Sequence, residues 1–321
     1  MDTVIIGIHG LRNKPPKYVL TGWWKRSIIE GFRHAGLRVP RIRFMMAYWA
    51  HYMHVRPQLQ SVKDPEDPRY LPEPYVPGED FGPREPKSLR EKLSDGLHGQ
   101  ILQLISGKHG FMNIDAVSDI ILHRMFVELD TYYHKKLRDG FGGRSPARDL
   151  IRGELAGLIE KHRKRQILVL AHSMGAIIAY DVLLHVVPDI PIHTFITMGA
   201  PLGFPVILRQ IRHELGLGRS DTVPLPTPPS IQHHWLNFSD LDDSTCLNYD
   251  LHNHYRENSN GVRPHDQIVF NNYAYKGHSN HHKGYGYLRT PQVTDALHQF
   301  LCLENAGMWQ RLKWVFRKPE F

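Results

Sequence analysis

Residues 166–187 read QILVLAHSMGAIIAYDVLLHVV, and this stretch decides the fold. Residues 167–170 are all apolar, which indicates a strand buried on both faces, as in parallel sheets. Small residues open the second segment, whose apolar residues recur at helical spacing and predict a helix; they are Ala176, Ile177, Tyr180, Leu183, Leu184 and Val187. A strand that turns directly into a helix with a serine at the bend predicts a nucleophile at Ser173.

The neighbours of Ser173 fit this chemistry. A serine hydroxyl is a weak nucleophile, so it must be exposed on a sharp turn where a histidine base can reach it. Such a turn leaves no room for large side chains two positions away, and Ala171 and Gly175 stand there. Met174 would open the helix, so its N–H would point a donor and the positive end of the helix dipole at a developing oxyanion.

The pentapeptide Ala171-His172-Ser173-Met174-Gly175 resembles the nucleophile elbow of the α/β-hydrolase superfamily, in particular its bacterial lipase and esterase branch. The usual pattern is G-x-S-x-G, and the alanine fits if its backbone need not take a positive φ. The resemblance implies a mostly parallel central sheet flanked by helices and a serine, acid and histidine triad in that order, with no cofactor. The alternative is a chance S-x-G after a buried strand.

A second apolar run, residues 4–8, ends in His9-Gly10-Leu11. A buried strand followed by His-Gly is similar to the first catalytic strand of lipase-like hydrolases. That resemblance implies that the Leu11 N–H is the second oxyanion donor and that Gly10 allows close backbone approach to substrate. His9 would then be a structural residue rather than the base. A simple strand-to-loop turn is the alternative.

The acid should follow a later strand. Residues 235–238 predict a short strand that leads into SDLDDS at 239–244. This segment is similar to a D-x-x-D pattern of bacterial relatives, which implies that Asp243 is the acid and that Asp240 braces the loop. Asp242 remains a third candidate. An acidic cluster that caps a helix or resembles a calcium site is the alternative.

The base should come last in the chain. Residues 266–273, DQIVFNNY, alternate and predict the final strand, and the following loop contains His278, His281 and His282. In the family a histidine lies just ahead of a G-Y-L segment, which implies His282; the other two remain alternatives. The spacing H-x-x-H-H lacks helical i, i+4 ligand geometry and an accompanying Glu or Cys set, so no metal site is predicted.

The chain is predicted to form one α/β-hydrolase domain over residues 1–321, with an insert at about residues 50–148. Within the insert, residues 56–86 are rich in proline and charge, which argues against regular structure and predicts an exposed excursion. Residues 88–138 recover helical periodicity. The resemblance implies a lid over the site, and a peripheral appendage is the alternative. The tail, residues 304–321, is basic and amphipathic, which fits docking on its own domain, dimerisation or contact with an anionic membrane.

Composition sets the remaining expectations. The 321 residues are 41% hydrophobic, enough for a sizeable core, and the net charge of +8 comes from scattered residues without a nucleic-acid motif. No nucleic-acid partner is therefore expected. The two cysteines, Cys246 and Cys302, form no disulfide framework, and no signal peptide or membrane-spanning run is visible. These features predict a cytoplasmic protein, with peripheral membrane contact through the tail as an option.

Together these motifs predict a serine esterase that acts on a small-molecule or lipid ester. Ser173 would attack the acyl carbonyl, His282 would transfer the proton, and Asp243 would orient the imidazole. A thioesterase or acyltransferase would use the same residues with another acceptor. A non-catalytic module that binds membranes or proteins on the hydrolase fold is the alternative from a different class.

Overall fold

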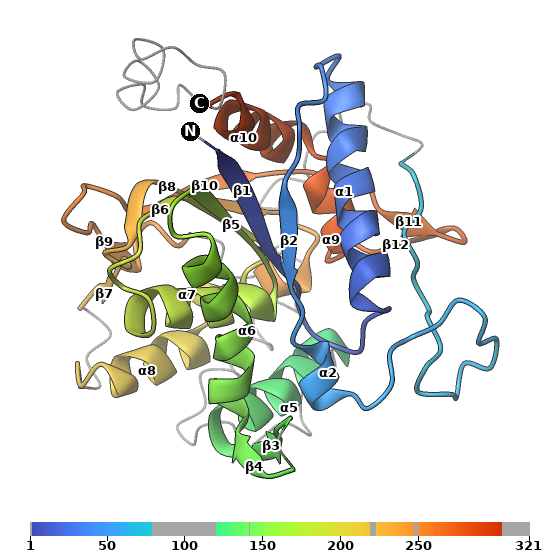
Figure 1. The fold of residues 1–321 in the computed structure, drawn as a ribbon, viewed down its shortest axis with the longest axis horizontal. Helices are drawn as coiled ribbons and strands as arrows, with labels where there is room; N and C mark the ends of the chain where they lie inside the picture. The colour runs from blue at the N-terminus through green and yellow to red at the C-terminus, as the bar shows by residue number, and fades with distance from the viewer. Residues whose placement is uncertain (1, 79–119, 141, 219–222, 247–249, 304–321) are drawn as a thin grey trace, which may run out of the picture.

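The computed structural model describes residues 2–78, 120–140, 142–218, 223–246 and 250–303. Within these residues, one six-stranded sheet has the order β10-β8-β6-β5-β1-β2, and every neighbouring pair is parallel (Figure 1). Its strands are β1 (Thr3–Ile8), β2 (Phe44–Ala47), β5 (Gln166–His172), β6 (Ile192–Met198), β8 (Ile231–Ser239) and β10 (Pro264–Ile268). The predicted α/β fold with a parallel sheet flanked by helices is confirmed.

Helices cover both faces of the sheet (Figure 1). One face carries α1 (Lys17–His34), α9 (Gly284–Leu288) and α10 (Pro291–Cys302). The other face carries α6 (Ala147–Lys161) and α7 (Met174–His185). The hydrophobic core under α6 and α7 also includes residues of α5 (Ile120–His134) and α8 (Pro205–Glu214). The shorter elements are α2 (Ala50–Met53), β3 (Lys136–Arg138), β4 (Arg144–Pro146), η2 (Pro201–Gly203), β7 (Leu225–Pro226), η3 (Ser244–Cys246), β9 (Tyr255–Arg256), β11 (Ala274–Tyr275) and β12 (His278–Ser279). The sheet is therefore the middle layer of three.

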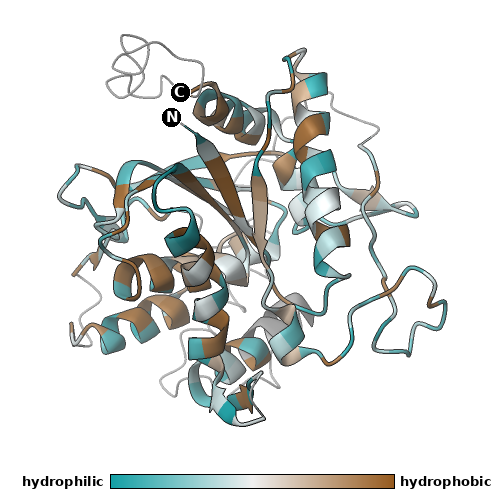
Figure 2. Cartoon of the chain, in the orientation of Figure 1, coloured by the Kyte–Doolittle hydropathy of each residue, from teal (hydrophilic) through white to brown (hydrophobic). Residues whose placement is uncertain are grey.

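Both faces of strand β1 are covered by helices, which explains why its sequence is apolar. Val4, Ile6 and Ile8 belong to the core under α6 and α7, whereas Ile5 belongs to the core under α1 and α10. Successive side chains of a strand point to opposite faces, so a strand with both faces covered needs apolar residues at every position. Figure 2 shows the result: β1 is hydrophobic along most of its length, whereas α1 alternates between hydrophilic and hydrophobic stretches.

The predicted last strand at 266–273 is wrong in its bounds. The strand β10 ends at Ile268, and the chain leaves the sheet before the β11–β12 hairpin. Val269 and Tyr273 are still buried in the core, which accounts for the apolar alternation that predicted a longer strand. Asn271 forms hydrogen bonds to Asp240 and to the carbonyls of His281 and Lys283 instead of ladder bonds. Val269 N–H still donates to the Ser239 carbonyl of β8 at 2.9 Å, but beyond Val269 the alternation reflects burial without strand pairing.

The predicted insert is described only in part. Residues 79–119 lie outside the described residues. The tail, residues 304–321, also lies outside them, so the contact of the tail with a membrane or a second chain stays a prediction. Residues 57–78 are irregular as predicted, with one bridge between Leu59 and Tyr70, but Leu71 is buried. On α5, Leu129 and Tyr132 lie in the same core as α7. These parts of the insert pack onto the domain.

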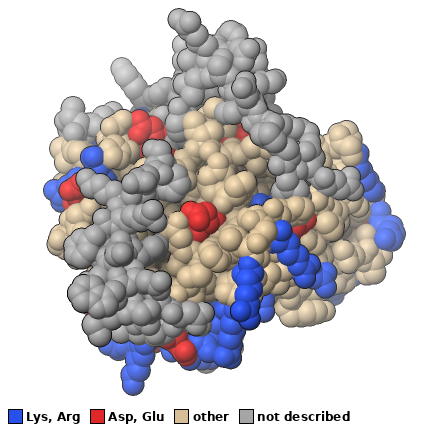
Figure 3. Space-filling view, turned by 90° about the horizontal axis from the view of Figure 1, so that it is seen from above, with Lys and Arg blue, Asp and Glu red and all other residues tan. Residues whose placement is uncertain are grey.

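Two features of the surface bear on partners. Among the described residues, no helix combines the length and the apolar character that crossing a membrane requires. Figure 3 shows one face of the molecule, on which lysine and arginine side chains form several separate groups with uncharged residues between them. The scattered charges of the sequence are thus also scattered in space on this face.

A buried ionic network ties α5, α6 and α7 together. Asp181 of α7 is 4% exposed and accepts hydrogen bonds from Arg148 at 2.8 Å, from Arg152 at 2.6 Å and from the hydroxyl of Tyr132. Burial alone would raise the pKa of Asp181, but the hydrogen bonds from the two arginines outweigh it and hold the pKa below its ordinary value. The carboxylate is therefore ionised at neutral pH and stabilises the fold there.

Replacing Asp181 with asparagine is expected to lower the free energy of unfolding by about 3 kcal/mol at pH 7, because two arginines lose a buried partner. A depressed pKa stabilises the fold above the unfolded-state value, and this contribution is lost as pH falls through the folded-state value. The difference from wild type should therefore shrink below about pH 4. Urea denaturation at pH 7 and pH 3 measures it, with exposed Asp189→Asn as the control. A difference that is absent at pH 7, or equal at both pH values, would contradict this role.

Candidate active site

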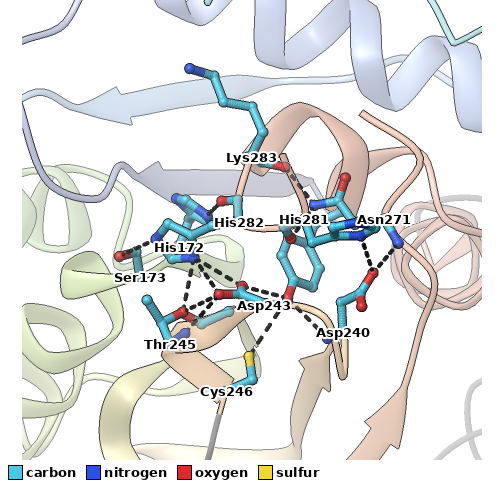
Figure 4. Close-up of polar contacts among 12 residues, drawn as sticks. His172, Ser173, Asp240, Asp243, Thr245, Cys246, Asn271, His281, His282 and Lys283 are labelled. Atoms are coloured by element: carbon cyan, nitrogen blue, oxygen red, sulfur yellow. Dashed lines mark hydrogen bonds and ion pairs between the residues drawn. The ribbon is translucent and has the colours of Figure 1, made fainter. Parts of the chain in front are cut away.

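The carboxyl ends of four strands meet at one edge of the sheet, and Ser173, Asp240 and Asp243 of the predicted site lie there (Figure 4). Gly10 lies just past β1, Ser173 follows β5, Gly199 follows β6, and residues 240–243 follow β8. Because the strands are parallel, their carboxyl ends lie side by side, and this edge is where ligands of open α/β sheets bind. Residues far apart in the sequence thus meet in one place.

Ser173 occupies a strained bend between β5 and α7. Its φ of 56° and ψ of −130° lie in a region that costs a residue with a side chain roughly 1–3 kcal/mol. Two backbone hydrogen bonds hold the bend: Ser173 N–H donates to the Met198 carbonyl at 3.0 Å, and the Ser173 carbonyl accepts from Ala176 at 2.8 Å. The surrounding sheet and helix therefore impose the strain.

Small residues are required around this bend. A Cβ atom at Gly175 would lie 2.7 Å from the carbonyl oxygens of Ile8 and His9, and one at Gly10 would lie 2.6 Å from Cβ of Ser173. Both distances are too short for non-bonded atoms, so only glycine fits. Ala171 is a buried strand residue whose φ is not positive, which is why alanine is accommodated. The loop after β1 consequently lies directly against Ser173.

A chain of hydrogen bonds joins Ser173, His282 and Asp243 (Figure 4). Ser173 Oγ is 2.9 Å from Nε2 of His282, and Nδ1 of His282 is 2.9 Å and 3.0 Å from the two carboxylate oxygens of Asp243. An ionised carboxylate only accepts, so Nδ1 carries the proton and Nε2 accepts from the serine hydroxyl. Of the other candidate histidines, His281 lies 3.4 Å from Asp240, and His278 is exposed on β12.

The carboxylate of Asp243 is buried and fully engaged. It accepts hydrogen bonds from the Tyr287 hydroxyl at 2.8 Å, from Thr245 N–H at 2.9 Å and from the Thr245 hydroxyl at 2.7 Å. Burial alone would raise its pKa, but the electrostatic interaction with His282 and the hydrogen bonds from His282 and Thr245 outweigh this and hold the pKa below its ordinary value. Asp243 is therefore ionised at neutral pH.

The other two aspartates have different positions. Asp240 is buried and accepts from the backbone N–H of Asp242 at 2.7 Å and of Asn271 at 2.6 Å, so it braces the loop after β8. The Asp242 side chain is exposed. Of the three candidates, Asp243 is the one whose carboxylate contacts Nδ1 of His282.

Two further histidines hold the loops of the site. His172 Nε2 donates to the backbone carbonyl of His282 at 2.8 Å, and the two rings lie 4.9 Å apart. Burial, and then the nearby His282, lowers the pKa of His172 well below its ordinary value, so its ring is neutral. His9 accepts from Trp49 N–H at 3.2 Å and stacks on the Trp49 ring at 4.8 Å. His9 and His172 thus have structural contacts in the loops.

Three residues contact Asp243 in ways that were not predicted from the sequence. Gly199 has a φ of 55°, and a Cβ atom there would lie 2.8 Å from Oδ2 of Asp243. Thr245 and Tyr287 bind Asp243, as described above. Thr245 lies two positions after the aspartate, which is the spacing of a side-chain turn, so a local signal for it existed. The contacts of Gly199 and Tyr287 with Asp243 had no local signal, because both residues reach the carboxylate only through the fold.

Glu73 fixes the irregular segment 57–78 to the loop of His282. Its carboxylate accepts from Nδ2 of Asn280 at 2.8 Å and 2.9 Å and from Nζ of Lys283 at 3.0 Å. Asn280 in turn accepts from the backbone N–H of His282 at 3.0 Å. Glu73 therefore binds the residues on both sides of the histidine. The segment was predicted to be an exposed excursion, and at this point that prediction is wrong.

Two clusters in the described residues have the spacing of metal ligands. One is Asp240, Asp242 and His281, and the other is Asp181, His185 and Glu214. The Asp240 carboxylate already accepts two backbone N–H groups, and the second cluster lies in the ionic network under α7. Neither cluster includes Ser173, Asp243 or His282.

Neither the models of known protein families nor the curated proteins gave a match to the chain. Its function must therefore be argued from the site. The site consists of a strained serine, a histidine within hydrogen-bond distance of it and a buried carboxylate behind the histidine. All three lie at the edge of the sheet where ligands bind.

Proposed function

We propose that this protein is a serine hydrolase of the α/β-hydrolase type that cleaves carboxylic esters through an acyl-enzyme. The observation that carries the proposal is the hydrogen-bonded chain from Ser173 through His282 to Asp243, with contacts of 2.9 Å on each side of the imidazole. The order serine, aspartate, histidine along the chain is that of α/β-hydrolases. The strand–serine–helix bend sets the buried Ser173 hydroxyl against the imidazole of His282, the base that such chemistry needs.

In this mechanism Nε2 of His282 takes the proton as Oγ of Ser173 attacks the acyl carbonyl. Asp243 keeps the proton on Nδ1 and stabilises the imidazolium that forms. The tetrahedral intermediate collapses, and the leaving alcohol receives the proton from His282. Water then loses a proton to His282, attacks the acyl-enzyme and releases the carboxylic acid, which restores Ser173.

The oxyanion would be bound by two backbone N–H groups. Met174 is the first residue of α7, so its N–H has no acceptor one turn earlier in the helix and lies at the positive end of the dipole. Leu11 would supply the second donor from the loop that Gly10 brings against Ser173. Each such donor contributes roughly 3–4 kcal/mol to the transition state in related chemistry.

The strain at Ser173 argues for catalysis rather than binding alone. A positive φ at a serine costs free energy and persists only where the surrounding structure imposes it. Such a bend presents the hydroxyl to the imidazole, which a binding module would not require. The strain and the alignment therefore favour an enzyme over a module without catalytic activity.

Part of the insert is proposed to act as a cap on the site. The pocket that contains Gly10, His172 and His282 is also lined by Leu71, Pro72 and Glu73 from residues 57–78. These residues would shape the space for the acyl or alcohol group of the substrate. The preference of the enzyme for the length of the substrate's acyl chain should therefore change when Leu71 is replaced by alanine.

A panel of 4-nitrophenyl esters from acetate to decanoate tests the proposed activity, with a thioester and an alcohol acceptor added to separate esterase, thioesterase and acyltransferase. We expect hydrolysis of at least one ester with a burst of nitrophenol that matches the enzyme concentration when deacylation is slow. Folded wild-type protein that turns over no ester faster than Ser173→Ala would contradict the proposal.

Replacing Glu73 with glutamine is expected to lower kcat for ester hydrolysis about fivefold with little change in KM, because charge-assisted hydrogen bonds that hold the loop of His282 are lost. The matched control is Glu66→Gln, an exposed residue of the same segment. Steady-state kinetics and thermal unfolding are measured on both variants. An unchanged kcat in Glu73→Gln, or an equal loss in the control, would show that Glu73 does not position the base.

A further inference from the structure

The pocket beside Ser173 and His282 has two chemically different walls. Leu20, Trp24 and Leu71 form an apolar wall, and Arg12, Lys14 and Lys283 contribute cationic side chains. The loop after β1 therefore supplies both the proposed oxyanion donor, Leu11, and two of the cations. A substrate in this pocket would meet positive charge close to the reacting carbonyl.

Lys283 has a carboxylate partner. Its Nζ lies 3.0 Å from Glu73 and stands over the rings of Tyr273 at 5.7 Å and Tyr285 at 5.6 Å. Figure 4 shows its side chain pointing away from Asp240 and Asp243. The charges of Lys283 and Glu73 therefore offset each other, and the positive excess of the pocket must come from the loop after β1.

Lys14, when protonated, carries a charge that its hydrogen bonds do not neutralise. Its Nζ donates to the carbonyl oxygens of Leu11 and, at 3.0 Å, of Arg12. Carbonyl oxygens accept hydrogen bonds but carry no net charge. Burial lowers the pKa of Lys14 to about 7; Glu128 opposes this, and Lys283 lowers the pKa further. Lys14 is therefore only partly protonated at neutral pH, and a bound oxyanion would favour its ammonium form.

Arg12 adds a second cation on the same loop. Its φ is 71°, and its backbone N–H donates to the Glu128 carboxylate at 2.8 Å. Glu128 brings a second acid to this end of the pocket. Among the described residues, the lining thus includes three basic side chains and the carboxylate of Glu73, with Glu128 at the end next to Arg12, so basic groups outnumber acidic ones by one.

We propose that this basic wall binds an oxyanion group of the substrate, a carboxylate or a phosphate, so that the preferred esters carry a negative charge next to an apolar portion. The inference rests on the proposed esterase function and names its substrate class. Guanidinium and ammonium groups in a partly buried pocket form charge-assisted hydrogen bonds with such oxyanions. The apolar wall would receive the uncharged part of the same molecule.

Two esters of equal chain length test the proposal. The 4-nitrophenyl monoester of glutaric acid carries a terminal carboxylate, and 4-nitrophenyl valerate carries a methyl group in its place. The wild type should hydrolyse the anionic ester with a kcat/KM about tenfold higher, after correction for spontaneous hydrolysis. Lys14→Met and Arg12→Gln should each lower this ratio about tenfold. The control Lys17→Met, an exposed lysine three positions along, should keep the wild-type ratio.

The ratio separates charge from positioning, because a displaced loop lowers both rates together. A wild-type ratio of one or less, or a ratio that neither variant lowers, would overturn the anionic subsite. Inorganic phosphate and glutarate are then added as inhibitors of 4-nitrophenyl valerate hydrolysis. The anion that inhibits more strongly identifies the preferred oxyanion. If neither anion inhibits, the anionic subsite is overturned. If neither ester is cleaved and Ser173 does not react with a fluorophosphonate, the proposed function itself has failed.

Discussion

Replacing Ser173 with alanine is expected to reduce kcat for ester hydrolysis by about 10⁶-fold, as loss of the nucleophile does in other serine hydrolases. Nothing else at the bend can attack the acyl carbonyl, and the oxyanion donors alone retain only a small part of the rate enhancement. The alanine takes the same backbone bend, so the thermal midpoint should stay close to that of the wild type. Single-turnover and steady-state assays measure the loss.

The control for this substitution is Ser259→Ala, which removes the hydroxyl of an exposed serine. Its kcat should equal that of the wild type. A residual rate of more than a few per cent in folded Ser173→Ala would mean that another group is the nucleophile.

Replacing Asp243 with asparagine is expected to lower kcat about 10⁴-fold with a small change in KM. The amide would donate to Nδ1 of His282 and so force the imidazole proton onto Nε2. A protonated Nε2 could not accept the proton of Ser173. The buried hydrogen bonds from Thr245 and Tyr287 would also lose a charged acceptor. Steady-state kinetics of the purified variant give both constants.

Asp240→Asn is the matched comparison, because Asp240 is equally buried and lies on the same loop. Its carboxylate accepts backbone N–H groups rather than the imidazole, so kcat should fall by about tenfold or less. A larger loss in Asp240→Asn than in Asp243→Asn would show that the acid has been assigned to the wrong residue.

The central strands and the bend at Ser173 were predictable because their signals are local. An apolar run, a serine and small neighbours within residues 166–187 are enough to specify strand, bend and helix. The same holds for residues 4–8, where a continuous apolar run became β1. In each case the side chains that decide the structure lie within a few positions of one another.

The bounds of β10 were not predictable by the same means. Val269 and Tyr273 alternate as in a strand because both are buried in the core. Val269 also donates to Ser239 of β8, and whether pairing continues past it depends on Asn271, whose backbone N–H donates to Asp240, a residue 31 positions earlier. A pattern of burial alone does not distinguish these two situations.

The choice among the acids and bases depended on the resemblance to a family, since spacing alone left Asp240, Asp242 and Asp243 open. The structure separates them by what each carboxylate contacts. Glu73 had no signal at all: it lies in a proline-rich segment without periodicity and meets Lys283 across 210 positions. Contacts of this kind arise only from the complete fold.

Reaction with a fluorophosphonate probe, followed by mass spectrometry of the digested protein, tests the central claim most directly. Such a probe forms a stable bond only with a serine that an adjacent base activates. We predict a single adduct on the peptide that contains Ser173 in the wild type, and no adduct in Ser173→Ala or His282→Ala. Folded wild-type protein that stays unlabelled, or an adduct on a different serine, would contradict the account.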